Sequence, residues 1–252
     1  MRLLTAARDL ARRKARERDA RFVAEGIRAV EELLASPLEL VGVLCAPQLL
    51  DSVRGTQLRQ AVERRGVPLA DVTEREFAGA ASTESPQGVL AIGRIPDRQL
   101  SALADRERLT LLVLDGVQDP GNVGTMIRTA HALGADATIA LPGTVDVWNA
   151  KVVRSAMGSL FRHHVQAASS NELAGFAATH AVELWAADAG GVEVGKLRRP
   201  ARLGLVLGNE GAGVGAAMEP HLAQRVSLAM PGGAESLNVA IAAGILLYEL
   251  RA

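Results

Sequence analysis

Apolar residues recur along the chain with the periods of strands and helices, and the two alternate. In residues 1–94, short apolar runs predict strands at RFVAEG, LELVGVLCA, VPLADV and GVLAIG. Between them, IRAVEELLAS and SVRGTQLRQAVERRG have the spacing of amphipathic helices. The pattern predicts a small α/β/α domain over residues 1–94. The polar segment 95–108, which contains Pro96, predicts a linker.

Residues 109–252 alternate strands and helices as a parallel sheet requires. Strands are expected at LTLLVLDGV, DATIAL, VELWAAD, LGLVLG and RVSLAM. Helices are expected at GNVGTMIRTAHALGA, NAKVVRSAMGSL and SLNVAIAAGILLYELRA. Ligands of such sheets bind at the carboxyl ends of the strands. The informative loops are therefore those after Leu114, Leu207 and Ala229.

Composition narrows the class of protein. With 48% apolar and 22% charged residues, the chain is an ordinary globular protein. No apolar run approaches the roughly 20 residues of a membrane span, and the N-terminus does not resemble a signal peptide. The single cysteine, Cys45, excludes an internal disulfide, favours a cytoplasmic location and is expected in the core. No Cys/His cluster suggests a metal site.

The charge balance is zero overall but uneven along the chain. Residues 1–21 hold eight basic and three acidic residues, a local charge of +5 that fits either phosphate contacts or a solvated helix face. Because aromatic residues are only 3%, an RNA partner would be recognised by its shape and backbone. His163 and His164 are expected at the surface. Two explanations fit Lys151, Arg154 and Arg162 equally well: they extend a phosphate-binding surface, or they lie on a solvated face.

The glycine-rich stretch GLVLGNEGAGVG, residues 204–215, looks at first like a nucleotide-binding turn. Dinucleotide enzymes and conventional methyltransferases place that turn after their first strand, with a ribose-binding acid roughly 20 residues later. Residues 216–252 are too few to complete such a domain. The glycines are better explained as positions where the backbone closely approaches a ligand.

The three strand-end loops, 114–135, 205–214 and 226–249, carry a more specific signal. In this order they resemble the three motifs of the SpoU (TrmH) family of RNA ribose methyltransferases. The matching residues are Asn122, Gly124 and Arg128 in the first motif, Gly208 and Glu210 in the second, and Ser236, Leu237 and Asn238 in the third. Residues 1–94, with FVAEG and ESPQG, resemble the ribosomal-protein-like substrate-binding domain of many members.

The resemblance implies a parallel α/β domain with a deep trefoil knot, an S-adenosylmethionine pocket formed by the knot, and a homodimer held by the C-terminal domain. It implies catalytic roles for Arg128, Asn122, Glu210, Ser236 and Asn238, and cofactor contacts from Gly208, Leu228 and Leu237.

Simpler explanations stand beside these roles. Asn122 fits a helix N-cap, and Glu210 fits a residue that holds its loop by bonding backbone amides. Ser236 and Asn238 fit the start of the last helix. Arg128 is either a phosphate clamp or a proton acceptor, and that choice stays open.

The expected function is S-adenosylmethionine-dependent 2′-O-ribose methylation of RNA. Ribosomal RNA is favoured, because family members that act on transfer RNA often carry short helical extensions in place of a separate N-terminal domain. The alternatives are a transfer RNA methyltransferase, a non-catalytic RNA-binding homologue and a conventional Rossmann-type enzyme. Residues 1–94 are expected to choose the RNA, and residues 109–252 to carry the chemistry.

Overall fold

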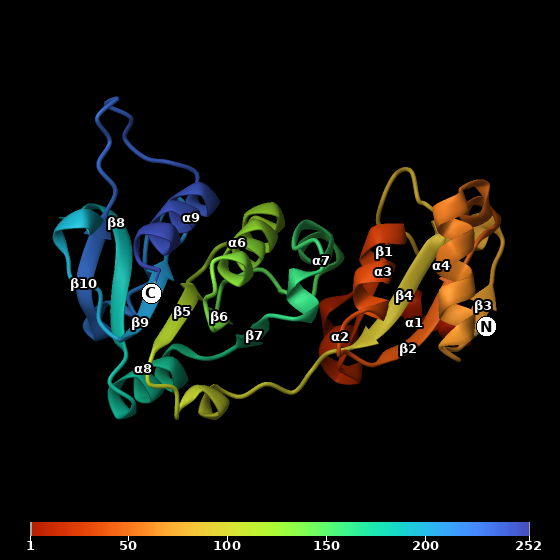
Figure 1. Ribbon diagram of the computed structural model, residues 1–252, viewed down its shortest axis with the longest axis horizontal. Coiled ribbons are helices and arrows are strands. Elements are labelled where there is room, and N and C mark those ends of the chain that lie inside the picture. The colour runs from red at the N-terminus through yellow and green to blue at the C-terminus, as the bar shows by residue number, and fades with distance from the viewer. Residues whose placement is uncertain (1, 252) are drawn as a thin grey trace. The chain divides into compact units, whose positions relative to one another are not determined.

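The computed structural model describes residues 2–251, which form two compact units, each built around its own sheet (Figure 1). The N-terminal unit is Met1–Asp97 together with Trp148–Arg162. The catalytic-motif unit is Arg98–Val147 together with His163–Ala252.

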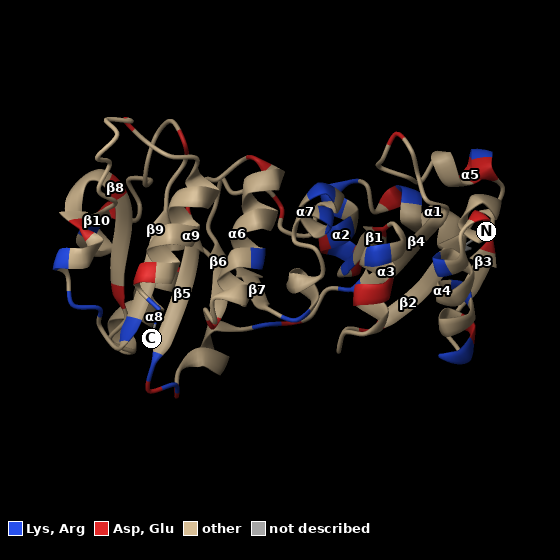
Figure 2. Ribbon diagram, turned by 45° about the horizontal axis from the view of Figure 1, so that its top comes forward, with Lys and Arg blue, Asp and Glu red and all other residues tan. Residues whose placement is uncertain are grey.

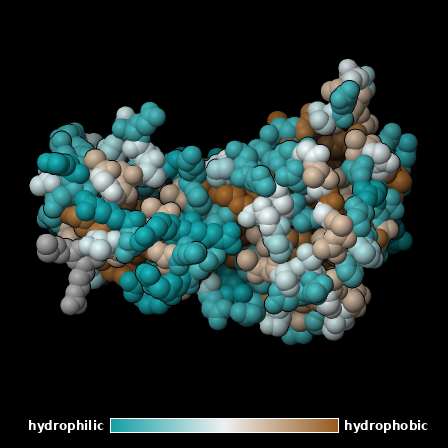
Figure 3. Space-filling model, turned by 180° about the vertical axis from the view of Figure 1, so that it is seen from behind, coloured by the Kyte–Doolittle hydropathy of each residue, from teal (hydrophilic) through white to brown (hydrophobic). Residues whose placement is uncertain are grey.

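The N-terminal unit contains a mixed four-stranded sheet in the order β1-β4-β2-β3. β4 runs antiparallel to both β1 and β2, and β3 runs parallel to β2. The strands are β1 (Arg21–Glu25), β2 (Leu40–Cys45), β3 (Leu69–Asp71) and β4 (Val89–Arg94). The helices are α1 (Arg2–Asp9), α2 (Arg13–Asp19), α3 (Ile27–Leu34), α4 (Val53–Arg64) and α5 (Glu74–Ala78). All the strands expected in residues 1–94 are therefore present. Seen from behind, the surface of this unit is largely hydrophilic (Figure 3).

The segment Trp148–Arg162, which the sequence pattern placed in the second block, packs on the N-terminal unit. It contains α7 (Ala150–Ser155) and a short 3-10 helix, Ser159–Phe161. The ring of the fully buried Phe22 lies 4.6 Å from that of Trp148 and 5.5 Å from that of Phe161, measured between centroids. At the edge of this aromatic cluster Arg162 pairs with Glu32 at 2.8 Å.

The catalytic-motif unit contains a six-stranded sheet, ordered β10-β8-β9-β5-β6-β7, in which every pairing is parallel. Its strands are β5 (Leu109–Leu114), β6 (Ala137–Ala140), β7 (His164–Ala167), β8 (Glu183–Glu193), β9 (Arg202–Leu207) and β10 (Leu222–Ser227). The predicted parallel sheet is confirmed, although β7 was not foreseen.

Three α-helices belong to this unit: α6 (Pro120–Ala132), α8 (Ser170–Thr179) and α9 (Val239–Glu249). The sequence pattern predicted α6 and α9 but not α8. A Cβ at Gly244 of α9 would lie 3.4 Å from Thr129 of α6, so α9 packs at Gly244 against α6 of the same chain. Within residues 2–251 no helix combines the length and the apolarity needed to cross a membrane.

The structure tests the predicted burial of Cys45 and the predicted exposure of His163. Cys45 is buried, as expected, and burial raises the pKa of its thiol to about 11. The surface placement of His163 is wrong: the residue is 3% exposed and its Nε2 lies 2.9 Å from Oγ1 of Thr138. Burial lowers the pKa of His163 to about 3, and it also lowers the pKa of the half-buried His164.

Candidate active site

A cavity of about 960 Å³ opens at the carboxyl ends of the strands of the catalytic-motif unit. Its walls come from the last part of β8, the loop after β9, the loop after β10 and the start of α9. Among its lining residues are these predicted site residues: Gly208, Glu210, Leu228, Ser236, Leu237 and Asn238. Residues from two distant motifs thus meet at one cavity.

The loop after β9 folds back on itself to make one wall. The backbone groups of Asn209 and Gly213 exchange two hydrogen bonds of 2.9 Å, and Oδ1 of Asn209 accepts from the amides of Gly211 and Ala212. A Cβ on Gly208 would lie only 2.2 Å from the carbonyl carbon of Gly213. The loop's own fold therefore requires glycine at position 208, and this wall of the cavity is main chain.

Two further residues, which sequence reasoning did not assign to the site, fasten this loop to the end of β5. Asp115 is 8% exposed, and its Oδ2 accepts the amide of Gly215 at 2.7 Å. Nδ2 of Asn209 donates to the carbonyl of Gly116 at 2.9 Å. The available signal was position: Asp115 directly follows a buried strand, and Asn209 lies inside the G-N-E-G motif.

A chain of side-chain hydrogen bonds joins the three motifs. Asn122 donates from Nδ2 to Oε1 of Glu210 at 3.0 Å, and Nδ2 of Asn238 donates to Oδ1 of Asn122 at 3.1 Å. Oδ1 of Asn238 in turn accepts the amide of Ala240 at 2.9 Å, so Asn238 is the N-cap of α9 as expected. The first motif therefore contacts both loops that line the cavity.

Two of the simpler explanations are wrong. The N-cap of α6 is Asp119, whose Oδ1 accepts the amide of Asn122 at 2.7 Å, so Asn122 is not the cap. Glu210 bonds to the side chain of Asn122 and not to backbone amides of its own loop.

Arg128 stands apart from this network. It is exposed on α6, and it forms no hydrogen bond or ion pair with any residue in 2–251. Six residues of helix separate it from Asn122, which corresponds to about 9 Å along the axis and to a different helix face. Ser236 is likewise exposed, and within the described chain its hydroxyl has no bonding partner. Both side chains are available to a ligand.

Part of the positive charge of the basic N-terminal segment is paired within its own unit. Three arginines there form ion pairs, Arg12 with Asp9, Arg13 with Glu17 and Arg18 with Asp19. Arg16 is 5% exposed and donates to the carbonyl of Leu10 at 2.7 Å. These three ion pairs use all three acidic residues of segment 1–21, so the local excess of five positive charges remains and fits either phosphate contacts or a solvated face.

No metal site was found among residues 2–251, in which no group of three or more His, Cys, Asp or Glu side chains is arranged to bind an ion.

Comparison with known families gives two matches. The model of the SpoU rRNA Methylase family matches residues 110–248, and that of the MRM3-like substrate binding domain matches residues 4–91.

Similar proteins cover nearly the whole chain. The 23S rRNA (guanosine(2553)-2′-O)-methyltransferase RlmP of Bacillus subtilis is 35% identical over 95% of this chain and 92% of its own. The 23S rRNA (uridine(2479)-2′-O)-methyltransferase of Streptomyces viridochromogenes is 30% identical over 95% of this chain and 85% of its own.

Similar solved structures also cover nearly the whole chain. The AdoMet-bound rRNA methyltransferase of Sinorhizobium meliloti has a TM-score of 0.85 at 29% identity, covering 99% of this chain and 94% of its own. The SpoU methyltransferase AviRb of Streptomyces viridochromogenes, in complex with AdoMet, has a TM-score of 0.86 at 27% identity, covering 98% of this chain and 96% of its own.

Proposed function

Because the chain belongs to the SpoU rRNA Methylase family, we propose that it methylates the 2′-hydroxyl of a ribose in 23S ribosomal RNA, with S-adenosylmethionine as methyl donor. The near-full-length relatives described above bear names of enzymes that modify this RNA. The observation that carries the proposal is the hydrogen-bonded chain Glu210–Asn122–Asn238, which joins all three motifs beside one cavity. The alternatives of a transfer RNA substrate or a non-catalytic homologue have no comparable support.

The cavity fits the cofactor in size and in the character of its walls. Small-molecule sites are typically clefts of about 300–1,000 Å³, lined mainly by apolar side chains with a few directed polar groups. Here the walls combine the main chain at Gly208 with the side chains of Leu228 and Leu237. When bound, S-adenosylmethionine supplies an activated methyl group.

The residues of the chain would then position the ribose and stabilise the charge that develops on its oxygen. A guanidinium stays protonated in proteins, so Arg128 acts as a clamp on the adjacent phosphate and favours the developing alkoxide. The exposure of Arg128 and its freedom from other bonds within residues 2–251 suit this role. Glu210 and Asn238 hold Asn122 in one orientation, which fixes the first motif next to the cavity.

A homodimer formed through α9 is part of the proposal. Three large side chains on one face of this helix are exposed, Ile241 at 55%, Ile245 at 40% and Tyr248 at 51%. An apolar helix face left in water is unfavourable, and a second copy of the chain would cover it. The position of Arg128 away from its own cavity supports a site that is completed by the second copy.

We further propose that the C-terminal segment is threaded as a trefoil knot. The chain passes from β9 in the interior of the sheet to β10 at its edge, then returns in α9 to pack beside α6. This route supports the knotted arrangement, as do the bonds of the loop after β9 to the end of β5 and the bond from Asn238 to Asn122 of α6. The N-terminal unit would bind the ribosomal RNA, and the activity would take place in the cytoplasm, where that RNA is found.

The test measures cofactor binding by calorimetry and methyl transfer to 23S ribosomal RNA and to transfer RNA. We expect binding of S-adenosylmethionine and transfer to the ribosomal RNA alone. Mapping ribose methylations in cells with and without the gene then identifies the nucleotide. Cofactor binding without transfer to any RNA would contradict the proposal.

A further inference from the structure

A group of charged residues lies at the amino ends of the strands, at the edge of the sheet opposite the cavity. β5 and β9 run side by side, with Leu109 paired to Arg202 at one end and Leu114 paired to Leu207 at the other. The cavity adjoins Leu207, whereas the starts of the strands are about 17 Å away, at roughly 3.3 Å per residue. We refer to five residues near the strand starts as the basal arginine cluster: Arg106, Arg108, Arg198, Arg199 and Arg202.

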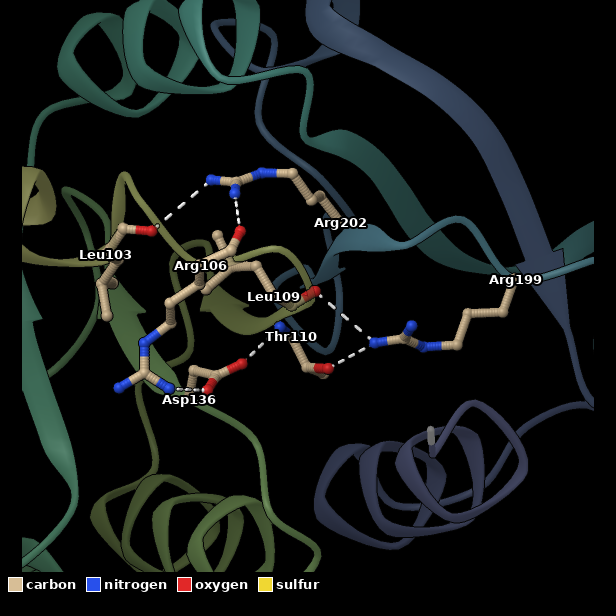
Figure 4. Close-up of polar contacts among 7 residues, drawn as sticks. All are labelled: Leu103, Arg106, Leu109, Thr110, Asp136, Arg199 and Arg202. Atoms are coloured by element: carbon tan, nitrogen blue, oxygen red, sulfur yellow. Dashed lines mark hydrogen bonds and ion pairs between the residues drawn. The ribbon is translucent and has the colours of Figure 1, made fainter.

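Within residues 2–251, two arginines of the cluster bond only to neutral acceptors (Figure 4). Arg202 donates to the carbonyls of Arg106 and Leu103, and Arg199 donates to the carbonyls of Leu109 and Pro200 and to Oγ1 of Thr110. Carbonyl and hydroxyl oxygens satisfy hydrogen bonds without cancelling a full charge. These guanidiniums therefore hold the loops together without forming an ion pair with any carboxylate in residues 2–251.

The outer members of the cluster are unpaired as well. Arg108 and Arg198 are exposed, and in residues 2–251 neither forms a hydrogen bond or an ion pair. Burial and the charge of Arg108 lower the pKa of Arg199, and the charge of Asp136 acts in the opposite direction. Arg98, further along this edge, donates to the carbonyl of His163.

The carboxylates at this end neutralise only part of the charge. Asp136 bonds to Arg106 through one oxygen, and its other oxygen accepts the amide of Thr110 at 2.8 Å. Glu183 accepts the indole N–H of Trp185. Asp105 and Glu107 are exposed in the same turn as Arg106. Lysine and arginine residues are visible at the base of this unit and in the adjoining loop before β9 (Figure 2).

In the N-terminal segment, by contrast, three surface arginines pair with carboxylates. Like charges held together are repulsive unless an anion joins them, and guanidiniums match phosphate oxygens in geometry. We propose that the basal arginine cluster binds backbone phosphates of the substrate RNA, at a distance from the ribose that is methylated. The inference rests on the proposed function, and it assigns a second RNA contact to the catalytic-motif unit.

Such contacts would position the RNA without reading its sequence, and they would make binding depend on salt. A folded ribosomal RNA is wide enough to approach both ends of a strand about 17 Å long. The cluster would therefore favour a large folded RNA over a short fragment carrying the same target nucleotide.

The test uses the full-length protein with Arg108→Glu and Arg198→Glu combined, because neither side chain bonds to the rest of the described chain. Affinity for a folded 23S ribosomal RNA fragment is measured as a function of salt. We expect affinity for the RNA to fall at least tenfold. The negative slope of log K against log salt should become shallower by about 0.7–0.9 for each lost phosphate contact. S-adenosylmethionine affinity and thermal unfolding should match the wild type.

Two matched variants control for charge. Arg108→Lys with Arg198→Lys keeps the charge and should retain most of the affinity. Asp105→Asn with Glu107→Gln removes negative charge from the same turn and should strengthen RNA binding. Unchanged RNA affinity and unchanged salt dependence across all three variants would overturn the inference. If the wild type itself neither binds S-adenosylmethionine nor methylates RNA, the proposed function fails, which is a distinct result.

Discussion

Asn122 of α6 and Glu210 of the loop after β9, 88 residues apart in the sequence, share a hydrogen bond of 3.0 Å from Nδ2 to Oε1. An ionised carboxylate only accepts, so the amide nitrogen of Asn122 faces Glu210 and its oxygen faces Asn238. One side-chain amide thus connects the loop after β9 to the N-cap of α9.

Replacing Asn122 should reveal this dependence on orientation. Asn122→Asp places a second carboxylate where a donor stood, so we expect a larger loss of methyl transfer than with Asn122→Ala, which only removes the bond. Initial rates with 23S ribosomal RNA would measure the difference. Equal rates for the two variants would show that the contact with Glu210 does not matter to the site.

Arg128→Ala should abolish methyl transfer while leaving cofactor affinity and thermal unfolding nearly unchanged. The reason is that Arg128 is exposed and makes no bond within residues 2–251, so little folded structure depends on it. Arg128→Lys keeps the charge but not the bidentate geometry, so partial activity is expected. Loss of cofactor binding in a well-folded Arg128→Ala variant would remove the assigned role.

Gly208 and Gly211 form a natural pair for testing the cavity wall. A Cβ on Gly208 would lie 2.2 Å from a backbone carbon, whereas a Cβ on Gly211 would be 3.7 Å from its nearest neighbour. We expect Gly208→Ala to lose cofactor affinity and about 1–3 kcal/mol of unfolding free energy, typical of overpacking. Gly211→Ala should be tolerated. Calorimetry and thermal melts measure both effects, and normal cofactor binding by Gly208→Ala would exclude position 208 from the site.

His163 should make stability sensitive to acid. Its folded pKa is about 3, against an ordinary value of 6.5, because burial disfavours the charged ring. Below pH 6.5 the unfolded chain binds a proton that the folded chain does not. The unfolding free energy should therefore be fully retained above that pH and fall on acidification, by about 1.4 kcal/mol per pH unit from this residue.

The comparison is with His163→Gln, which does not titrate and keeps polar atoms that can reach Thr138. Urea unfolding from pH 7 to pH 4 should give a shallower pH dependence for the variant. Parallel curves for the two proteins would mean that His163 is not held neutral.

The sequence by itself determined which strand-end loops line the cavity. Buried apolar runs predict parallel strands, and the carboxyl ends of parallel strands lie at one edge of a sheet. Gly208, Leu228 and Leu237 consequently line one cavity, as their positions after strands implied. Their chemical roles remain a proposal. Short elements escaped this reasoning: β7 has four residues, with the polar His164 and Gln166 among them, and its pattern is too brief to distinguish it from a loop.

Only the tertiary structure decided contacts between residues that are distant in the sequence. The segment Trp148–Arg162 reads locally like any helix of the second block, yet it packs against Phe22 of the first. Similarly, nothing near His163 in the sequence indicates that it will contact Thr138. Nor does the sequence near Asn122 indicate that it will bond to Glu210 while Asp119 caps the helix. Hydrophobic periodicity reports which face of an element is buried, because that depends on local geometry. It does not report which partner buries that face, because the partner is chosen by the shape and charge of surfaces that come together only in the folded chain.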